Sequence, residues 1–474
     1  MKIHEILAAR NSGNRNPGDV VGKQLRASMS VRIMFLGCLC AAGVARPDTL
    51  SLHGYAKIAL AHNPAPKIAQ SAVDASAASR EAALSALLPN VTGSAGLSRS
   101  GSSGSSLVPI IDTNAATHTI TSGSVSAIYV TPPGNNASAG INASLLLWDF
   151  GKSPLQYAAS GKSLSAAQRT FEGSVQTTIV NAVTAYYNYL LTGELLTVAQ
   201  NAQKQTNLHY DEAKVLFEVG KQTQLTVIQA KVDVANAEVS ELSAENAVNL
   251  ARVQLESAAG VTFKDPLVLT DSLAGIEDSI ALKDALVTAA ASRPDILSAS
   301  LNLEAARLQL RSVKASYLPQ LNASGGYSWN GTGVNGSTIS DNTQIGWNFG
   351  VALSVPLYEG GSIQASVRQA EATVKQTEAT LEQTVLNATQ NVEQQYFTEE
   401  QARKQIQATQ VVINESTEAL RLAEERYRAG LALAIEITDA EQTLATALSN
   451  HAQAEYNYRV GHVNLLNAMG VLHE

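Results

Sequence analysis

The second half of this chain of 474 residues repeats the first, and that repetition constrains the fold more than any other feature. Pro64 recurs as Pro294, and Gly260 recurs as Gly470 at a shorter offset. The first copy is therefore longer than the second, and its extra residues lie in the segment 98–147. Self-similarity of this kind indicates one structural unit present twice. We predict that each copy contains a helix, a pair of strands and a pair of long helices.

The composition favours long helices over a compact globule. Hydrophobic residues make up 45% of the chain, but many are alanine, and aromatic residues make up only 5%. A compact core of this size would use more large side chains. The net charge of −8, without any run of positive charge, argues against nucleic acid as a partner. The two cysteines, Cys38 and Cys40, lie near the N-terminus, which excludes a disulfide framework or a thiolate metal site further along.

Residues 1–45 are predicted to be a signal or targeting segment. An apolar stretch over 33–45 follows Arg32 and ends in small residues, which is typical of a secretory signal. It is too short to span a bilayer. The sequence Leu36-Gly37-Cys38 also resembles a lipidation box with Cys38 as the lipid carrier; the alternative is a plain hydrophobic region of the signal. Both interpretations predict export.

Four short segments alternate between large apolar and small or polar residues, as strands do. The clearest is 344–357, where every odd position from Ile345 to Leu357 is large and apolar. Its expected partner is 320–330, and the first copy offers 90–98 and 140–148. The stretch between these two, 99–139, is rich in Ser, Gly, Thr and Asn and is predicted to be a loop. Because successive strand side chains face opposite ways, each sheet face should be uniform, one apolar and one polar.

A half-buried sheet in a soluble protein and an outer-membrane β-barrel both alternate in this way. We favour the barrel, since the flanking sequence is long helix that offers no core for an apolar sheet face. Four strands cannot close a barrel, and an open edge in lipid is not viable, so the chain must oligomerise. Three protomers would give twelve strands, although these patterns do not fix that number. The residues expected to face lipid are Trp148, Tyr327, Trp329, Ile345, Trp347, Phe349 and Val351.

From Ser153 to Phe217 glycine is scarce and proline is absent after Pro154, and from Ser362 to Ala429 there is neither glycine nor proline. As helices each would be roughly 100 Å long. Gly220 and Gly430 fall where each should end and the chain reverse, which glycine permits. We therefore predict two long helical hairpins, 153–260 turning near Gly220 and 362–470 turning near Gly430. Each helix has a narrow apolar stripe between polar faces. This pattern suits a layer of helices that pack against one another along the stripe and face water elsewhere.

These features resemble the TolC family of outer-membrane efflux proteins over residues 50–472. The resemblance rests on Leu318-Pro319 before a strand, the segment 355–361 after the last strand, and above all Tyr427 to Gly430 followed by 435–440. It implies an α+β membrane protein: a trimeric twelve-stranded outer-membrane β-barrel, four strands per chain, continued by a long periplasmic α-helical barrel. The chain would consist of tandem repeats 46–260 and 293–472, joined by an equatorial segment 261–292.

The resemblance also implies a function and its site. Family members are passive exit ducts that serve an inner-membrane pump, of the RND or ABC type, through a periplasmic adaptor protein. Glu436, Asp439 and Tyr427 match positions that close the periplasmic end, and acidic rings there would favour cations. The alternative is that the two acids only complement a helix dipole. The hairpin tips at Gly220 and Gly430 are the expected adaptor contacts.

No catalytic, metal or cofactor site is expected. The eight histidines lack metal-ligand spacing, and neither a nucleophile elbow nor a phosphate loop occurs. His451 and His462 are interpreted as polar residues on a helix surface. The alternative function is a structural or adhesive coiled-coil surface protein without a channel, which would have no need of four alternating strands. A helical periplasmic enzyme is the third option, and it lacks a candidate site.

Overall fold

The computed structural model describes residues 49–114, 119–264, 267–276, 280–334, 342–429 and 431–472. The predicted signal segment, Cys38 and Gly430 lie outside the described residues. Contacts divide the chain into two units. The first comprises the described residues up to Gln70, Arg169–Leu297, and those from Glu382 onward. The second comprises Ser71–Gln168 and Ser298–Leu381.

Four long helices form two hairpins. The first hairpin is α4 (Lys152–Glu218) with α5 (Gln224–Ala259), and the second is α8 (Ser362–Arg428) with α9 (Ala434–Met469). Stretches this poor in glycine and proline keep their backbone hydrogen bonds unbroken, which explains their length. Among the helices that the structure describes, none combines the length and apolarity needed to cross a membrane.

The core of the first unit surrounds α2 (Leu52–His62), where it packs on the first hairpin. Tyr55 and Tyr186 are fully buried, and the Tyr55 hydroxyl donates to the Leu255 carbonyl at 2.7 Å. Nearby, β1 (Thr49–Leu50) pairs in parallel with β4 (Val268–Leu269). Burying apolar area here stabilises the middle of α4 and the C-terminal end of α5.

A second cluster joins α6 (Leu282–Ser292), which lies within the segment 261–292, to the second hairpin. Arg293 extends this junction. Its Nη1 donates to the Ala468 carbonyl at 2.9 Å and to Asn391 Oδ1 at 3.1 Å. The other side of its guanidinium pairs with Asp295 at 2.8 Å. One side chain thus ties the start of the next helix to both α8 and α9.

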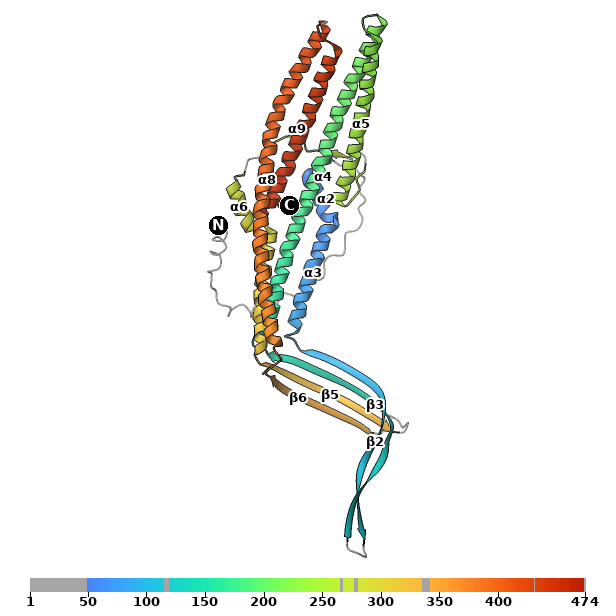
Figure 1. Ribbon diagram of the computed structural model, residues 1–474, viewed down its shortest axis with the longest axis vertical. Helices are drawn as coiled ribbons and strands as arrows, with labels where there is room; N and C mark the ends of the chain where they lie inside the picture. The colour runs from blue at the N-terminus through green and yellow to red at the C-terminus, as the bar shows by residue number, and fades with distance from the viewer. Residues whose placement is uncertain are drawn as a thin grey trace. The chain divides into compact units, whose positions relative to one another are not determined.

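The second unit contains an antiparallel sheet in the order β2-β3-β5-β6 (Figure 1). Its strands are β2 (Asn90–Asn114), β3 (Thr119–Trp148), β5 (Gln320–Val334) and β6 (Asn342–Ser354). The helices α3 (Pro64–Ser85) and α7 (Pro294–Lys314) precede the two strand pairs, and a short 3₁₀ turn, Ala315–Tyr317, follows α7.

The loop predicted over 99–139 is mostly strand, which corrects the sequence expectation. After a register shift between Ser100 and Ser102, β2 and β3 pair from Ser102↔Thr131 as far as Asn114↔Thr119. Pairing of β3 with β5 ends at Gly134↔Val334, so the distal part is a two-stranded ribbon (Figure 1). Ladder hydrogen bonds join backbone groups and need no side-chain alternation, so a Ser/Gly/Thr-rich segment can pair without showing a period.

The first residues of corresponding helices and strands in the two halves of the chain are separated by one of two fixed numbers of residues. The helices α2 and α6, the helices α3 and α7, and the strands β2 and β5 all begin the same distance apart in sequence. The helices α4 and α8, and likewise α5 and α9, share a second and shorter offset. The change of offset falls within the strands, where β2 and β3 are longer than β5 and β6.

Candidate functional site

One face of the sheet presents exposed apolar side chains. Ile141, Tyr327 and Trp347 pair across three adjacent strands, and side chains paired in this way share a face. Trp347 is 79% exposed and Phe349, on the same face of β6, is 73% exposed. Ile345 and Val351 are exposed as well, whereas Trp329 is half-buried. The alternation read from 344–357 is thus realised as an apolar surface.

Trp148 reaches this face through a β-bulge. The register shifts between Leu146 and Trp148, so that Trp148, rather than Leu147, pairs with Leu321. A bulge inserts one unpaired residue and reverses the side-chain alternation beyond it. Trp148 is exposed and lies edge-on to Phe150, with ring centroids 6.1 Å apart.

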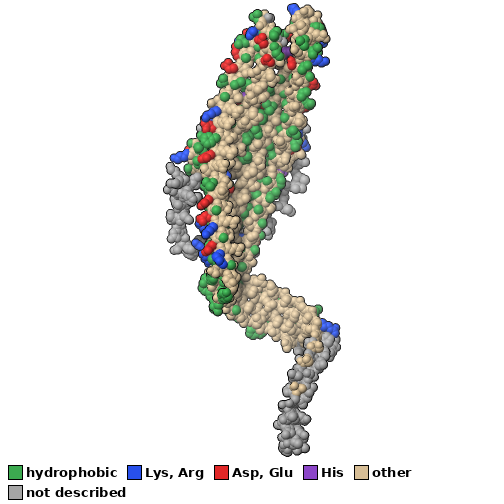
Figure 2. Space-filling view, in the orientation of Figure 1, with side chains coloured by type: hydrophobic (Ala, Val, Ile, Leu, Met, Phe, Trp, Pro, Cys, Tyr) green, Lys and Arg blue, Asp and Glu red, His purple; other side chains and the backbone are tan. Residues whose placement is uncertain are grey.

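The opposite face of the sheet is polar. A Cβ placed on Gly326 would lie 2.7 Å from the Oδ1 atoms of both Asn142 and Asn348, so these two amides lie over the glycine from either side. Figure 2 shows the described part of one sheet face as almost entirely polar uncharged side chains and backbone. The sheet is therefore amphipathic across its whole described width.

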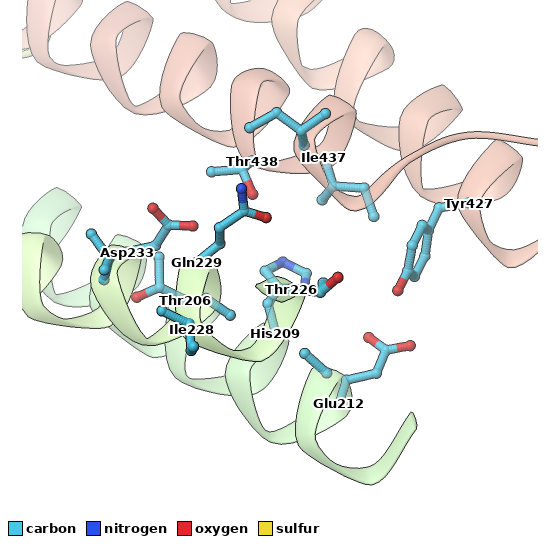
Figure 3. A pocket seen from close by; sticks show the side chains of 14 residues that line it. Thr206, His209, Glu212, Thr226, Ile228, Gln229, Asp233, Tyr427, Ile437 and Thr438 are labelled. Atoms are coloured by element: carbon cyan, nitrogen blue, oxygen red, sulfur yellow. The ribbon is translucent and has the colours of Figure 1, made fainter. Parts of the chain in front are cut away.

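A cavity of about 330 Å³ lies within the first unit, between the two hairpins near their turns (Figure 3). All four long helices line it. The polar lining residues are Thr206, His209, Glu212, Thr226, Gln229, Asp233, Tyr427 and Thr438, and the large apolar ones are Ile228, Val232, Ile435 and Ile437.

Tyr427, one of the predicted gate residues, lines this cavity. Its hydroxyl points toward the Glu212 carboxylate (Figure 3). Burial, and then the negative charge of Glu212, raise the pKa of the Tyr427 hydroxyl, while a hydrogen bond with Gln222 lowers it. Thr226 lines the same cavity. The structure therefore brings these two positions together.

Glu436 and Asp439 do not line the cavity. The Glu436 carboxylate accepts from the Leu433 backbone N–H at 3.4 Å and lies 3.6 Å from Arg426 Nη2. The hydrogen bond from Leu433 to Glu436 caps the first turn of α9. An acid at this place complements the helix dipole, which was the alternative interpretation of Glu436. Asp439 is exposed. A constriction lined by these acids stays a prediction.

Gly220 ends the first long helix. Its φ is +76°, and the next amide, Lys221 N, donates back to the Leu216 carbonyl at 2.8 Å. Glycine favours this left-handed C-terminal turn, which ends α4 before α5 begins at Gln224. Thr223 then starts α5 by accepting from the Thr226 amide.

Sequence reasoning missed a contact between the hairpins. His209 Nε2 on α4 lies 2.8 Å from Glu441 Oε1 on α9. The partners are far apart in the sequence, and neither belongs to a motif, so only the packing of α4 beside α9 could reveal them. The interpretation of His451 and His462 as helix surface was wrong. His462 is buried against Glu399 at 2.8 Å, and His451 meets Thr409 at 2.9 Å, because both face α8.

No group of metal-binding side chains is found among the residues that the structure describes. The cavity contains carboxylates, one imidazole and one phenol but no assembled ligand set. The carboxylates, imidazole and phenol of the cavity lining are groups that can exchange a proton with solvent. They can also form polar contacts that hold the two helical hairpins together.

Comparisons with known proteins agree with one another. The family model of outer membrane efflux proteins matches residues 56–261 and 285–471. The outer membrane protein TolC of Escherichia coli K12 is 24% identical over 351 residues, which are 72% of this chain and 70% of TolC. The alkaline protease secretion protein AprF of Pseudomonas aeruginosa is 24% identical over 313 residues, which are 64% of this chain and 63% of AprF.

A solved structure of CusC has the same fold. It superposes with a TM-score of 0.71 at 20% identity and covers 88% of this chain and 92% of CusC. The likeness includes long helices and a small sheet, as described above.

Proposed function

The chain belongs to the outer membrane efflux protein family, and on that premise we propose that it is the outer-membrane exit duct of a tripartite efflux or type I secretion system. The match over residues 56–261 and 285–471 carries this proposal, because it includes both helical hairpins and all four strands of the sheet. The duct conducts cargo passively from an inner-membrane pump and a periplasmic adaptor to the exterior. It performs no catalysis and needs no cofactor.

The duct is a homotrimer whose three sheets close into a twelve-stranded barrel. The edges of the four-stranded sheet, β2 and β6, support this, since an unpaired edge in lipid would leave backbone groups without partners. The apolar face that carries Trp148, Trp347 and Phe349 then faces lipid, and the face with Asn142 and Asn348 lines the lumen. The helical hairpins form the large periplasmic part.

The chain consists of two tandem copies of one unit. The recurrence of element starts at two fixed offsets supports this, because unrelated halves would not share both element order and spacing. Two copies in each of three chains give the wall pseudo-sixfold symmetry.

The gate lies at the periplasmic end, near the turns of the hairpins. Tyr427 supports this through its place in the cavity between them. Asp439, which is exposed, would contribute a ring of three carboxylates in a trimer, and Glu436 would add a second. The hairpin tips at Gly220 and Gly430 contact the adaptor.

Fractionation and conductance test the proposal. We expect the protein in outer-membrane fractions as a heat-sensitive trimer that opens ion-conducting pores in planar lipid bilayers. A soluble monomer, or a trimer that conducts no ions at any pH, would overturn it.

The cargo is a separate question, because named relatives differ. AprF is named for alkaline protease secretion and CusC for cation efflux. Deletion of the gene, followed by a broad comparison of toxicity and secreted proteins, would identify the cargo by the one class of phenotype that is lost.

A further inference from the structure

The contact between His209 and Glu441 links the two hairpins of one chain close to their turns. The ring nitrogen and the carboxylate oxygen are 2.8 Å apart. The His209 and Glu441 side chains are 30% and 16% exposed, so solvent screens the pair only in part. His209 also lines the cavity between the hairpins, opposite α8 and α9 (Figure 3). His209 belongs to one hairpin and Glu441 to the other, so separation of the hairpins would break the contact between them.

The groups that face His209 favour its charged form. The carboxylates of Glu212 on the same helix, Glu424 on α8 and Glu441 on α9 act electrostatically on His209. Asp233 lines the cavity from α5. Tyr427, also on α8, is neutral at physiological pH. Arg428 Nη2 is paired with Glu424 at 3.1 Å and offsets part of that charge. The negative charges of Glu212, Glu424 and Glu441 stabilise an imidazolium at His209.

We propose that His209 and Glu441 form a proton-dependent clasp that holds the two hairpins together when His209 is protonated and releases them when it is neutral. This inference rests on the proposed function, because the clasp matters only where hairpin separation opens a passage. Opening a passage between packed hairpins requires them to move relative to one another, and a contact across their boundary opposes that movement.

The direction of the pH effect follows from the chemistry. The hydrogen bond to Glu441, and then the charges of Glu441, Glu212 and Glu424, raise the pKa of His209 against the opposing effect of burial. The clasp is therefore complete below the unfolded-state pKa of about 6.5 and is lost as the pH rises through the higher folded-state value. Acid conditions should hold the hairpins together, and alkaline conditions should free them.

The test is bilayer conductance of the full-length trimer between about pH 5.5 and pH 8.5, the range over which histidine titrates. Wild type should conduct more as the pH rises. His209→Gln and Glu441→Gln should each abolish that step and raise the acid-side conductance by roughly two- to fivefold, as expected for a partly exposed ion pair. His209→Lys, which keeps its charge, should hold the conductance low throughout.

Two comparisons make the test specific. The double variant His209→Gln/Glu441→Gln should behave like either single variant, because both remove the same contact. His53→Gln makes the same exchange on the exposed surface of α2 and should leave the wild-type pH profile unchanged.

Hydrogen exchange supplies a second measurement, corrected for the intrinsic pH dependence of exchange. Near the hairpin turns, α4 and α9 should be more protected in wild type than in His209→Gln at acid pH, and equally protected at alkaline pH. Coincident pH profiles of wild type and His209→Gln, with unchanged protection, would overturn the clasp and leave the duct intact. A trimer without conductance at any pH would instead overturn the proposed function.

Discussion

Gly220, Gly260 and Gly470 show how one residue type meets different demands at helix ends. Their φ angles are +76°, +71° and +72°, so all three adopt the left-handed conformation that glycine favours. Their surroundings differ. A Cβ on Gly470 would lie 2.7 Å from Arg293 Cα, while one on Gly220 would meet nothing within 4 Å. At Gly470 the missing side chain also allows close packing.

Alanine substitutions at Gly220 and Gly470 distinguish the cost of left-handed backbone from the cost of a steric clash. Gly220→Ala should lower the free energy of unfolding by about 1–2 kcal/mol, the cost of left-handed backbone at a non-glycine residue. Gly470→Ala should cost a further ~1–3 kcal/mol, because the backbone at Arg293 must move. Thermal unfolding followed by circular dichroism would measure both. Equal losses would show that the approach to Arg293 carries no strain.

Tyr186 offers a second test at this scale. Its hydroxyl lies 2.6 Å from Asp271 Oδ2 and 2.9 Å from the Leu50 carbonyl, inside the core of the first unit. Burial, and then Asp271, raise the pKa of this hydroxyl, so it remains a donor at neutral pH. Tyr186→Phe should cost about 1–3 kcal/mol, since a buried acceptor loses its donor.

Tyr358, which is 86% exposed, supplies the matched control. Tyr358→Phe removes the same hydroxyl at the surface and should change the free energy of unfolding by no more than about 0.5 kcal/mol. A similar loss in both variants would show that Tyr186 contributes nothing through its hydrogen bonds.

Helices and strands differed in how far the sequence could predict them. The long helices were predictable because long stretches poor in glycine and proline favour helix, and β6 was predictable from its strict alternation. The β2–β3 ribbon was not, because Ser, Gly and Thr show no apolar period. The bulge before Trp148 and the pairing of His209 with Glu441 depend on how distant segments pack, which local patterns do not encode.

The ribbon can be tested as an element. Among the described residues, strands β2 and β3 pair only with each other beyond Ser100↔Gly134, so loss of the ribbon should leave the ladder between β3 and β5 intact. Replacing residues 101–133 with Asn-Gly, a favoured two-residue hairpin turn, should preserve the heat stability of the trimer. The measurement is the temperature at which the trimer band is lost on gels.

The control deletion removes residues 94–98 together with 136–140, whose backbones pair within the four-stranded part. It should lower the dissociation temperature markedly. If the ribbon deletion has the same effect, the ribbon takes part in assembly and is not an independent element.

The whole molecule can be tested through the two faces of its sheet. Phe349 is exposed on the apolar face, and its neighbour Asn348 lies on the polar face over Gly326. In a trimer with a lipid-facing barrel, Phe349→Arg should cost about 2–4 kcal/mol near the bilayer midplane and reduce the yield of trimer. Asn348→Arg should assemble normally, because its side chain faces water.

Quantitative blotting of outer-membrane fractions measures the trimer yield. Size-exclusion chromatography with light scattering should give three times the protomer mass for wild type and for Asn348→Arg. If both arginine variants assemble equally well, the apolar face does not contact lipid and the barrel assignment is wrong.

The self-pairing of the β2–β3 ribbon has an evolutionary consequence. Because residues 101–133 have no partner among the described residues of β5, the register of the remaining sheet does not depend on the length of the ribbon. Paired insertions or deletions there need no compensating change elsewhere. Natural selection can therefore change the length and side chains of this segment while the pairing of β3 with β5 and of β5 with β6 stays constant.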